Sequence, residues 1–386
     1  MIDSVTGLWR ETFLLIRLTV LGIRKTVVMQ KRDYSLLGKD GQKAVETGLA
    51  GANWYATIIP RKEMKEFIRR SDGPAIRDTF IWLAALFGFA SFGVALWPSL
   101  WSAPFWLAYG VVYGSSTDSR WHECGHGTAF KTRWMNDVVY QLACFMIMRN
   151  PVTWKYGHAR HHTDTTIVGR DPQILARRPP NLPKMFANLF GLVDVPLAVK
   201  SMIQLACGHL TEEEKDYVPN TKRSSAIRVA RIWLAVYAVT ILVAIYMGSV
   251  LPCMLIGLPR IYGAWHMTIT GILQHAALAD NVIDHRLNSR TILMNPISRF
   301  IYWNMNYHIE HHMFPMVPYH KLPALHERLK LDMPAPNSST WQAICEAFPV
   351  LWKQLKNPEF FLVRDLPPTA NPYLWTGREV AADAAE

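Results

Sequence analysis

The sequence is poor in charged residues and in cysteine, and it lacks the common cofactor-binding motifs. Only 18% of its 386 residues are Asp, Glu, Lys or Arg, below the ~25% of an ordinary soluble domain. The five cysteines form no Cys-x-x-Cys pair, which excludes a disulfide scaffold and favours a reducing compartment. No Gly-x-Gly-x-x-Gly fingerprint follows a strand pattern, and no haem or iron–sulfur cysteine motif is present.

Apolar residues, in contrast, make up 50% of the chain and aromatic residues 12%, with a net charge of +11. This composition can bury a large core, so extensive disorder is excluded. The positive charge could indicate nucleic-acid binding, but the basic residues do not gather into one basic domain. They fit better a membrane protein that keeps Lys and Arg on its cytoplasmic side. We therefore expect no nucleic-acid partner.

The first long segment without charge runs from Thr79 to Thr117. It divides near Pro98 into Thr79–Trp97 and a return leg that begins at Phe105. As a helix, Thr79–Trp97 would be about 28 Å long, close to the thickness of a bilayer's hydrocarbon core. This segment predicts a transmembrane hairpin.

A second uncharged segment, Ile232–Pro259, divides near Gly248. Its legs are roughly Val229–Met247 and Leu251–Leu273, and the second leg carries one charge, Arg260. This segment predicts a second hairpin, and hence four transmembrane helices. An even number of spans places both termini and the middle segment on one side. The positive-inside rule makes that side cytoplasmic, in a multi-pass protein of the inner or plasma membrane.

The remaining sequence shows little strand alternation, so we expect an all-α protein. The predicted architecture is two membrane hairpins with a cytoplasmic helical cap. We divide the chain into an N-terminal cytoplasmic or interfacial segment (1–75), a membrane and cap domain (76–330) and C-terminal cytoplasmic helices with a tail (331–386). Within the first segment, the apolar stretch Phe13–Val20 is interrupted by Arg17. We interpret this stretch as an amphipathic helix on the membrane surface.

Histidine is the residue type whose placement is most informative. The chain has 14 histidines, and eight of them fall into three short clusters spaced by one, three or four positions. Residues three or four positions apart lie on one face of a helix. The clusters are His122 and His126; His158, His161 and His162; and His308, His311 and His312.

A ninth histidine, His275, follows the return leg of the second hairpin, much as His122 follows the first. All nine can converge at the cytoplasmic mouth of the bundle. Nine imidazoles exceed the four ligands of a single zinc ion and suit two metal ions, for which iron is a good candidate. The alternative is that His is simply common in this chain. We interpret the other five as surface or packing residues: His209, His266, His285, His320 and His326.

The three clusters resemble the histidine boxes of the membrane fatty acid desaturase and hydroxylase family. The segment Asn306–Pro315, Asn-Tyr-His-Ile-Glu-His-His-Met-Phe-Pro, is similar to the third box of acyl-lipid desaturases. The segment Leu273-Gln274-His275 resembles the site of an extra ligand in that family. The resemblance covers roughly residues 75 to 330. It implies two Fe²⁺ ions that use O₂ and two electrons, with all nine histidines as ligands.

Some features depart from particular subgroups. The chain has no Asn-Tyr-x-x-His-Tyr-Gly element, which argues against an alkane hydroxylase, and no His-Pro-Gly-Gly motif of a fused cytochrome b5. The ring nitrogens that do not face a metal need hydrogen-bond partners. Asp164, Asp171 and Asp280 are candidates for that role, and Asn281 could hold a metal-bound water. Arg260 could line the substrate channel or be a buried structural residue, since an unpaired charge within a span is costly.

The resemblance favours an oxidoreductase that introduces a double bond into a fatty acyl chain. The alternative is a hydroxylase or monooxygenase that acts on an acyl or non-acyl substrate with the same two irons. A third hypothesis, a metal transporter or receptor, is weaker because transporter ligands lie near the bilayer midplane. The enzyme would need an external donor: a ferredoxin, rubredoxin or cytochrome b5 with its reductase. Lys31-Arg32 and Arg177-Arg178 are candidate docking residues.

Overall fold

Helices connected by loops make up the fold. A computed structural model describes residues 32–375, and from Asp33 onward the chain forms one compact unit. Among these residues, extended pairing is limited to isolated bridges at Thr291 with Tyr307 and Ile292 with Asn337. The all-α prediction is therefore confirmed. The predicted surface helix at Phe13–Val20 lies outside the described residues.

The helices of residues 32–375 differ widely in length, and two of them are longer than 20 residues. In chain order the elements are α2 (Lys39–Glu46), α3 (Arg61–Phe67), α4 (Asp72–Ala95), η1 (Leu100–Ser102), α5 (Ala103–Gly114), α6 (Ser116–His126), α7 (Arg133–Met146), α8 (Pro151–Thr163), α9 (Leu182–Asn188), α10 (Asp194–Ala206), α11 (Glu212–Tyr217), α12 (Asn220–Tyr246), α13 (Leu251–Leu255), α14 (Pro259–Tyr262), α15 (Trp265–His275), α16 (His285–Asn288), α17 (Pro296–Ile301), α18 (His308–Met313), η2 (Tyr319–Lys321), α19 (Leu322–Leu329), η3 (Lys330–Asp332) and α20 (Thr340–Gln354).

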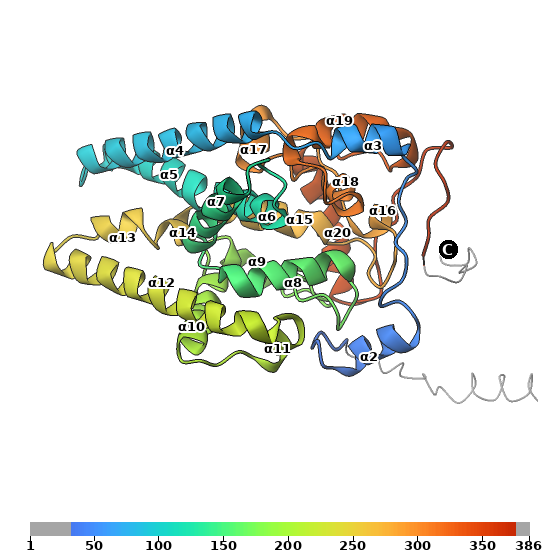
Figure 1. Cartoon of the computed structure of the whole chain (residues 1–386), viewed down its shortest axis with the longest axis horizontal. Helices are drawn as coiled ribbons and strands as arrows, with labels where there is room; N and C mark the ends of the chain where they lie inside the picture. The colour runs from blue at the N-terminus through green and yellow to red at the C-terminus, as the bar shows by residue number, and fades with distance from the viewer. Residues whose placement is uncertain (1–31, 376–386) are drawn as a thin grey trace, which may run out of the picture. The chain divides into compact units, whose positions relative to one another are not determined.

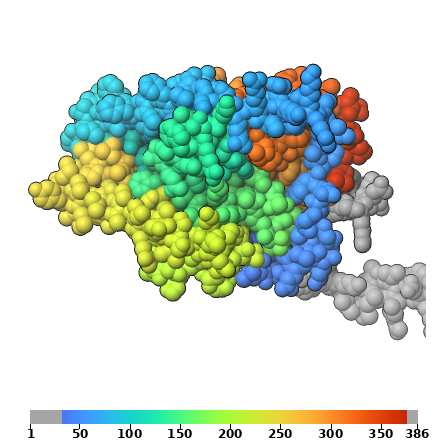
Figure 2. All heavy atoms as spheres, viewed as in Figure 1, coloured from blue at the N-terminus to red at the C-terminus, as the bar shows by residue number. Residues whose placement is uncertain are grey.

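The two long helices, α4 and α12, extend toward the same end of the unit (Figure 1). The α3–α4 stretch and α12 are the two helical stretches in residues 32–375 that are long and apolar enough to cross a membrane, with mean hydropathies of 1.6 and 2.0. Their apolar side chains face outward: Phe87 is 77% exposed and Ile245 is 71% exposed. In Figure 2 the yellow segment that contains α12 and α13 protrudes at this end of the surface. An exposed apolar surface of this kind is typical of a membrane or protein contact.

The return legs are less regular than the sequence suggested. The first return leg consists of two helices, α5 and α6, which meet at Ser115. The second leg, expected as one helix over Leu251–Leu273, is divided into α13, α14 and α15. Gly257, with a φ of +96°, and Pro259 separate the first two pieces. Helix geometry fails there because the left-handed backbone and the missing proline N–H interrupt the hydrogen-bond ladder.

A close contact between the two return legs positions the elements that follow them. A Cβ on Gly263 would lie 1.9 Å from the backbone of Gly110, so the legs can approach this closely only where both residues are glycine. The Ser115 hydroxyl then donates to the Gly263 carbonyl at 2.8 Å and accepts from the Met267 N–H at 3.0 Å. This contact joins α6, which carries the first histidine cluster, to α15, which ends at His275.

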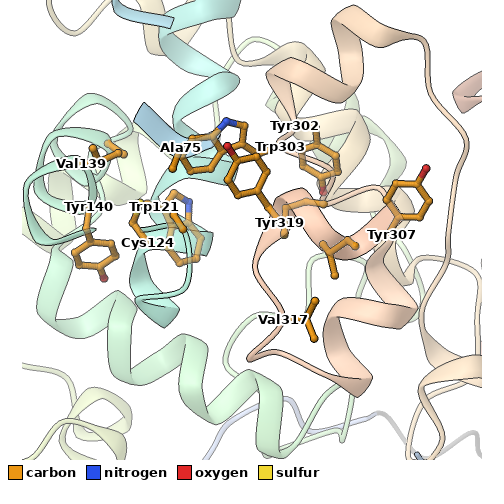
Figure 3. Packing of buried hydrophobic residues seen from close by; sticks show 14 of the residues in the cluster. Ala75, Trp121, Cys124, Val139, Tyr140, Tyr302, Trp303, Tyr307, Val317 and Tyr319 are labelled. Carbon is orange, nitrogen blue, oxygen red and sulfur yellow. The ribbon is translucent and has the colours of Figure 1, made fainter. Parts of the chain in front are cut away.

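A buried aromatic core packs around α6, α8 and α18, the helices that carry the three histidine clusters. We call these helices, with the end of α15, the cap. In Figure 3, Trp121 lies near Tyr140, while Trp303 and Tyr319 lie beside each other. The rings of Trp303 and Tyr319 stack with centroids 4.3 Å apart. The Tyr319 N–H donates to the Glu123 carboxylate at 3.0 Å, which links the third histidine segment to the first. The cap is therefore held together by contacts between segments far apart in the sequence.

The predicted domain limits fall within packed structure. Residue 75, the end of the first predicted segment, lies inside α4. Beyond residue 331, Ala343 and Ala347 of α20 pack in one hydrophobic cluster with Leu273 of α15. The C-terminal helix thus covers the element that carries His275.

Candidate metal centre

The nine predicted ligands come from four elements that meet in the cap: α6, α8, the end of α15, and α18. Local sequence explains where these helices begin and end. α6 ends at His126 because the next residue, Gly127, adopts a φ of +69°, the left-handed conformation that commonly ends a helix. α8 begins with Asn150 as its N-cap, whose side chain accepts from two backbone N–H groups, followed by Pro151 at the first helical position.

The histidines divide into two groups, within each of which the ligand atoms lie within 4.8 Å of one another. We call them the five-histidine group and the four-histidine group. The three sequence clusters do not correspond one to one to the two groups, since the second and third clusters each contribute histidines to both groups. The five-histidine group is His122, His126, His158, His162 and His311, and the four-histidine group is His161, His275, His308 and His312.

The Nε2 atoms converge inside each group. His158 Nε2 lies 3.1 Å from that of His126 and 3.2 Å from that of His162. In the other group, His308 Nε2 lies 3.1 Å from that of His275 and 3.0 Å from that of His312. Such a cluster of ring nitrogens, with lone pairs directed at one another, is favourable when a cation lies between them.

Several Nδ1 atoms have partners that fix the ring orientation. His161 Nδ1 lies 2.8 Å from the Asp171 carboxylate, and His275 Nδ1 donates to the Asn288 carbonyl at 2.8 Å. A histidine that donates from Nδ1 presents the lone pair of Nε2 to a metal.

Three further rings have neutral partners at Nδ1. These contacts are Met305 Sδ to His122 at 2.9 Å, Gln173 Oε1 to His158 at 3.0 Å and Thr165 Oγ1 to His312 at 3.2 Å. Sequence reasoning missed Met305, Gln173 and Thr165, and only the position of Gln173, two residues after Asp171, hinted at such a role.

Burial keeps these imidazoles neutral. Desolvation, reinforced by neighbouring histidines, lowers the pKa values of His122, His158 and His311 well below the ordinary value of 6.5. Neutral imidazole is the form that binds metal ions. The buried, convergent, all-nitrogen donor set therefore fits two transition-metal ions such as iron.

The other predicted partners make different contacts. Asp171 contacts His161 as described. Asp164 binds two arginines, Arg160 at 2.5 Å and Arg170 at 3.2 Å. Asp280 lies 3.5 Å from Arg178. The Asn281 side-chain oxygen accepts from the Val168 N–H at 2.8 Å. Of the four predicted residues, Asp171 is therefore the one that these contacts join to a histidine of either group.

A cavity of about 550 Å³ adjoins the centre. Five of the nine histidines form part of its wall: His122, His158, His161, His275 and His308. The cavity continues between α9, α10 and α15, where Leu175, Met185 and Leu197 line it together with polar residues. A substrate in this cavity would contact histidines of both groups.

Arg260, a candidate for the substrate channel, is buried beside this cavity. Its guanidinium donates to the Ile147 carbonyl at 3.3 Å and pairs with Asp194 at 3.2 Å. Asp194 lines the cavity and Arg260 does not. Arg260 therefore contacts the cavity wall through Asp194.

His285 is a further residue whose position the sequence did not indicate. It is 2% exposed, and its ring centroid lies 5.0 Å from that of His312. Burial and the neighbouring His275 lower the pKa of His285 to about 3. It belongs to neither group of converging ligand atoms.

Taken together, the helical cap and its two adjoining groups of imidazoles define a class of protein: a helical histidine-rich protein with room for two metal ions beside a cavity. The family follows from comparison with known proteins. A family model described as "Fatty acid desaturase" matches residues 95–343, well over half of the chain. The protein belongs to the fatty acid desaturase family, as the resemblance of its histidine clusters predicted.

Curated relatives carry related names. An omega-3 fatty acid desaturase, chloroplastic, of Glycine max is 24% identical over 68% of this chain and 60% of its own length. An acyl-lipid (9+3)-(E)-desaturase of Dimorphotheca sinuata is 24% identical over 58% of this chain and 66% of its own length. A delta(12)-fatty-acid desaturase of Arabidopsis thaliana is 30% identical over 29% of this chain and 30% of its own length. In each of these three relatives, the matched part spans less than two thirds of the length.

Proposed function

We propose that this protein is an iron-dependent membrane desaturase that introduces a double bond into a fatty acyl chain. The observation that carries the proposal is the convergence of nine histidines, six buried and three partly exposed, in two groups, with five of the nine lining one cavity. Membership of the desaturase family and the names of the curated relatives support the same reaction.

The five-histidine and four-histidine groups would each hold one iron ion. The two irons would supply the O₂ chemistry that no side chain can perform on an unactivated methylene. The protein's own residues keep the imidazoles neutral by burial, orient them through partners such as Asp171, and bring the acyl chain alongside. Neutral ligands leave the positive charge of the metal ions uncancelled, unlike the carboxylates of soluble helical di-iron proteins.

The balance of the reaction requires an external donor. Desaturation removes two hydrogen atoms from adjacent carbons, and these supply two electrons and two protons. Reduction of O₂ to two water molecules consumes four electrons and four protons. The remaining two electrons come, one at a time, from a small carrier such as a ferredoxin, rubredoxin or cytochrome b5, and two protons come from solvent.

We further propose that α4 with α5, and α12 with the divided leg α13–α15, form two hairpins in the membrane, with the cap on the cytoplasmic side. Breaks in the second return leg are compatible with membrane depth because irregular backbone is tolerated where it is buried in protein. Single-cysteine labelling tests this arrangement. Cysteines placed at Ser99 and Ser249, in the two outer turns, should react from outside the cell. A cysteine at Lys131 should react only after permeabilisation, and the reverse pattern would refute the orientation.

Product analysis tests the reaction. The gene is expressed in a host that lacks the activity, and total fatty acids are compared by mass spectrometry with those of cells that express His311→Ala. We expect a new unsaturated product, two hydrogen atoms lighter than its precursor, with the wild type only. The matched control is His209→Ala, since His209 is exposed and outside both groups.

The mass of the product separates the two proposed reactions. A product one oxygen atom heavier than its precursor would favour the hydroxylase alternative with the same metal centre. Zinc without iron in the purified active protein would contradict both reactions, because zinc has no redox chemistry.

A further inference from the structure

The metal centre has two sides, and the substrate cavity occupies only one of them. His126, His162, His311 and His312 do not line the cavity. The side on which His312 lies is covered by His285 of α16 and, beyond it, by Trp54 in the extended segment before α3. Neither Trp54 nor His285 lines the cavity. A substrate that fills the cavity therefore leaves uncovered a partly exposed ring on this second side, Trp54.

The rings of Trp54 and His285 are stacked face to face. Their centroids are 4.2 Å apart and their planes differ by 4°. His285 in turn lies 5.0 Å, centroid to centroid, from the ligand ring of His312. The Nδ1 atom of His285 is buried without a hydrogen-bond partner, which is costly for a residue with a purely structural role. The three rings form a continuous series from Trp54 to a predicted iron ligand.

Trp54 is partly exposed, so its indole reaches the surface. Its Nε1–H donates to the Thr163 carbonyl at 3.0 Å. Thr163 directly follows His162, a member of the five-histidine group. Trp54 is thus joined to the four-histidine group through His285 and to the five-histidine group through one hydrogen bond.

We propose that Trp54 and His285 form the route by which electrons enter the metal centre, an inference that rests on the proposed function. A one-electron carrier docks over Trp54 and is oxidised by one electron. The electron passes along the Trp54–His285–His312 ring series and reduces the centre by one electron. Two such encounters supply the two electrons of a turnover, and neither Trp54 nor His285 changes its own oxidation state.

The physical reason is electronic coupling. Electron transfer slows steeply with the gap between donor and acceptor, and contacting π-systems reduce that gap. The Arg177-Arg178 pair, which the sequence suggested as a docking site for the carrier, is less favourably placed for docking than Trp54. Arg178 is buried and pairs with Asp280, whereas Arg177 lines the substrate cavity. A carrier at Arg177 would compete with the substrate, whereas a carrier at Trp54 would not.

The experiment measures reduction of the centre without turnover. Oxidised, iron-loaded protein is mixed anaerobically with a plant-type [2Fe–2S] ferredoxin in its reduced form, and oxidation of the ferredoxin is followed by absorbance at saturating concentration. The same protein is separately mixed with methyl viologen radical, a small reductant that needs no docking site. The variants are Trp54→Leu, Trp54→Met and Trp54→Phe. The matched control is Trp341→Leu, because Trp341 is exposed on α20.

We expect the limiting ferredoxin rate to fall by roughly tenfold or more in Trp54→Leu and Trp54→Met, with Trp54→Phe and Trp341→Leu within about threefold of the wild type. The methyl viologen rate and the iron content should be unchanged in all variants. Normal ferredoxin rates in both non-aromatic variants would overturn the proposal and favour direct entry at the partly exposed His126 or His162.

Loss of iron, or an equal loss of the methyl viologen rate, in both non-aromatic variants would also overturn it, since Trp54 would then be structural. A wild-type protein that oxidises methyl viologen radical but not ferredoxin would overturn the proposed docking of this carrier. A wild-type protein that holds no iron, or that oxidises neither reductant, would instead contradict the proposed function. The two failures are therefore distinguishable.

Discussion

The two histidine groups differ in how firmly their rings are held. In the five-histidine group, His126 and His162 are partly exposed, and the Nδ1 atoms of His162 and His311 are buried without a hydrogen-bond partner. In the four-histidine group, His275 is the one partly exposed ring and the Nδ1 atom of His308 is the one without a hydrogen-bond partner, while a carboxylate and a backbone carbonyl fix His161 and His275. A charged or carbonyl partner at Nδ1 raises the basicity of Nε2 and fixes its direction.

This difference indicates a division of roles between the two groups. We expect the four-histidine group to bind its metal ion more tightly and the five-histidine group to be the more exchangeable site. The two groups nevertheless share helices, since α8 and α18 each contribute to both. A change in either helix can therefore affect both metal ions.

Removal of a single ligand, from either group, should have the largest effect on activity. His308→Ala in the four-histidine group and His162→Ala in the five-histidine group should each lower desaturation by more than the roughly 100-fold typical of a lost ligand partner. Each variant should retain about one of the two irons, because the other group stays complete. Metal analysis and product formation are the measurements. Full iron content with full activity in either variant would contradict the assignment of that group.

Removal of a ligand's partner should have a smaller effect, confined to the four-histidine group. Asp171→Asn should weaken metal binding there by roughly 10- to 100-fold, because His161 loses its anionic partner. Metal titration of the metal-free protein measures the affinity. The control is Asp164→Asn, whose carboxylate contacts Arg160 and Arg170. Equal weakening by both substitutions would show that acidic residues act here only through general stability.

Metal removal from the wild type should reveal the same asymmetry. With a chelator in excess, we expect two phases of iron loss that differ by about tenfold or more in rate. The faster phase should come from the five-histidine group, which has two partly exposed ligands against one in the other group and no carboxylate partner. In Asp171→Asn the two phases should approach each other, because the slower ion is now held less firmly. A single phase in the wild type would remove the basis for distinguishing the two groups.

The smallest expected effect concerns the support of α18, the helix common to both groups. Burial lowers the pKa of His326, but its hydrogen bond to Glu310 and the Glu310 charge outweigh this and raise it above the ordinary 6.5. The ion pair therefore stabilises the fold fully below about pH 6.5, and this stabilisation is lost as the pH rises through the raised folded-state pKa.

We expect His326→Gln to lower stability by about 1 kcal/mol near pH 6 and by less near pH 9. Thermal unfolding of the two proteins in detergent at both pH values is the measurement. A difference that grows with pH would have the wrong sign for this ion pair.

Much of the candidate site could be predicted from the sequence. Uncharged segments of sufficient length and spacings of three or four residues are properties of the chain itself. They identified the two long apolar helices and all nine histidines that the structure gathers. The role of Asp171 could be predicted too, because this residue follows the second cluster closely in the chain.

Tertiary packing decided the rest. The sequence could not divide the second cluster, in which His161 joins one group and His158 and His162 the other. Adjacent residues on a helix point about 100° apart, so the division depends on what lies beside each face. The close approach of the two return legs depends on the contact between Gly110 and Gly263, which are far apart in the sequence.

Tertiary packing also explains why the sequence did not indicate the positions of His285 and Trp54. By itself, the sequence determined that the protein is helical, carries two long apolar helices and holds nine histidines at helical spacing, because these follow from composition and local periodicity. Only the tertiary structure decided which imidazoles share a metal ion, which side the cavity occupies, and that an indole 231 residues before His285 stacks on its ring. Those facts depend on contacts between distant segments, which arise only when the helices pack.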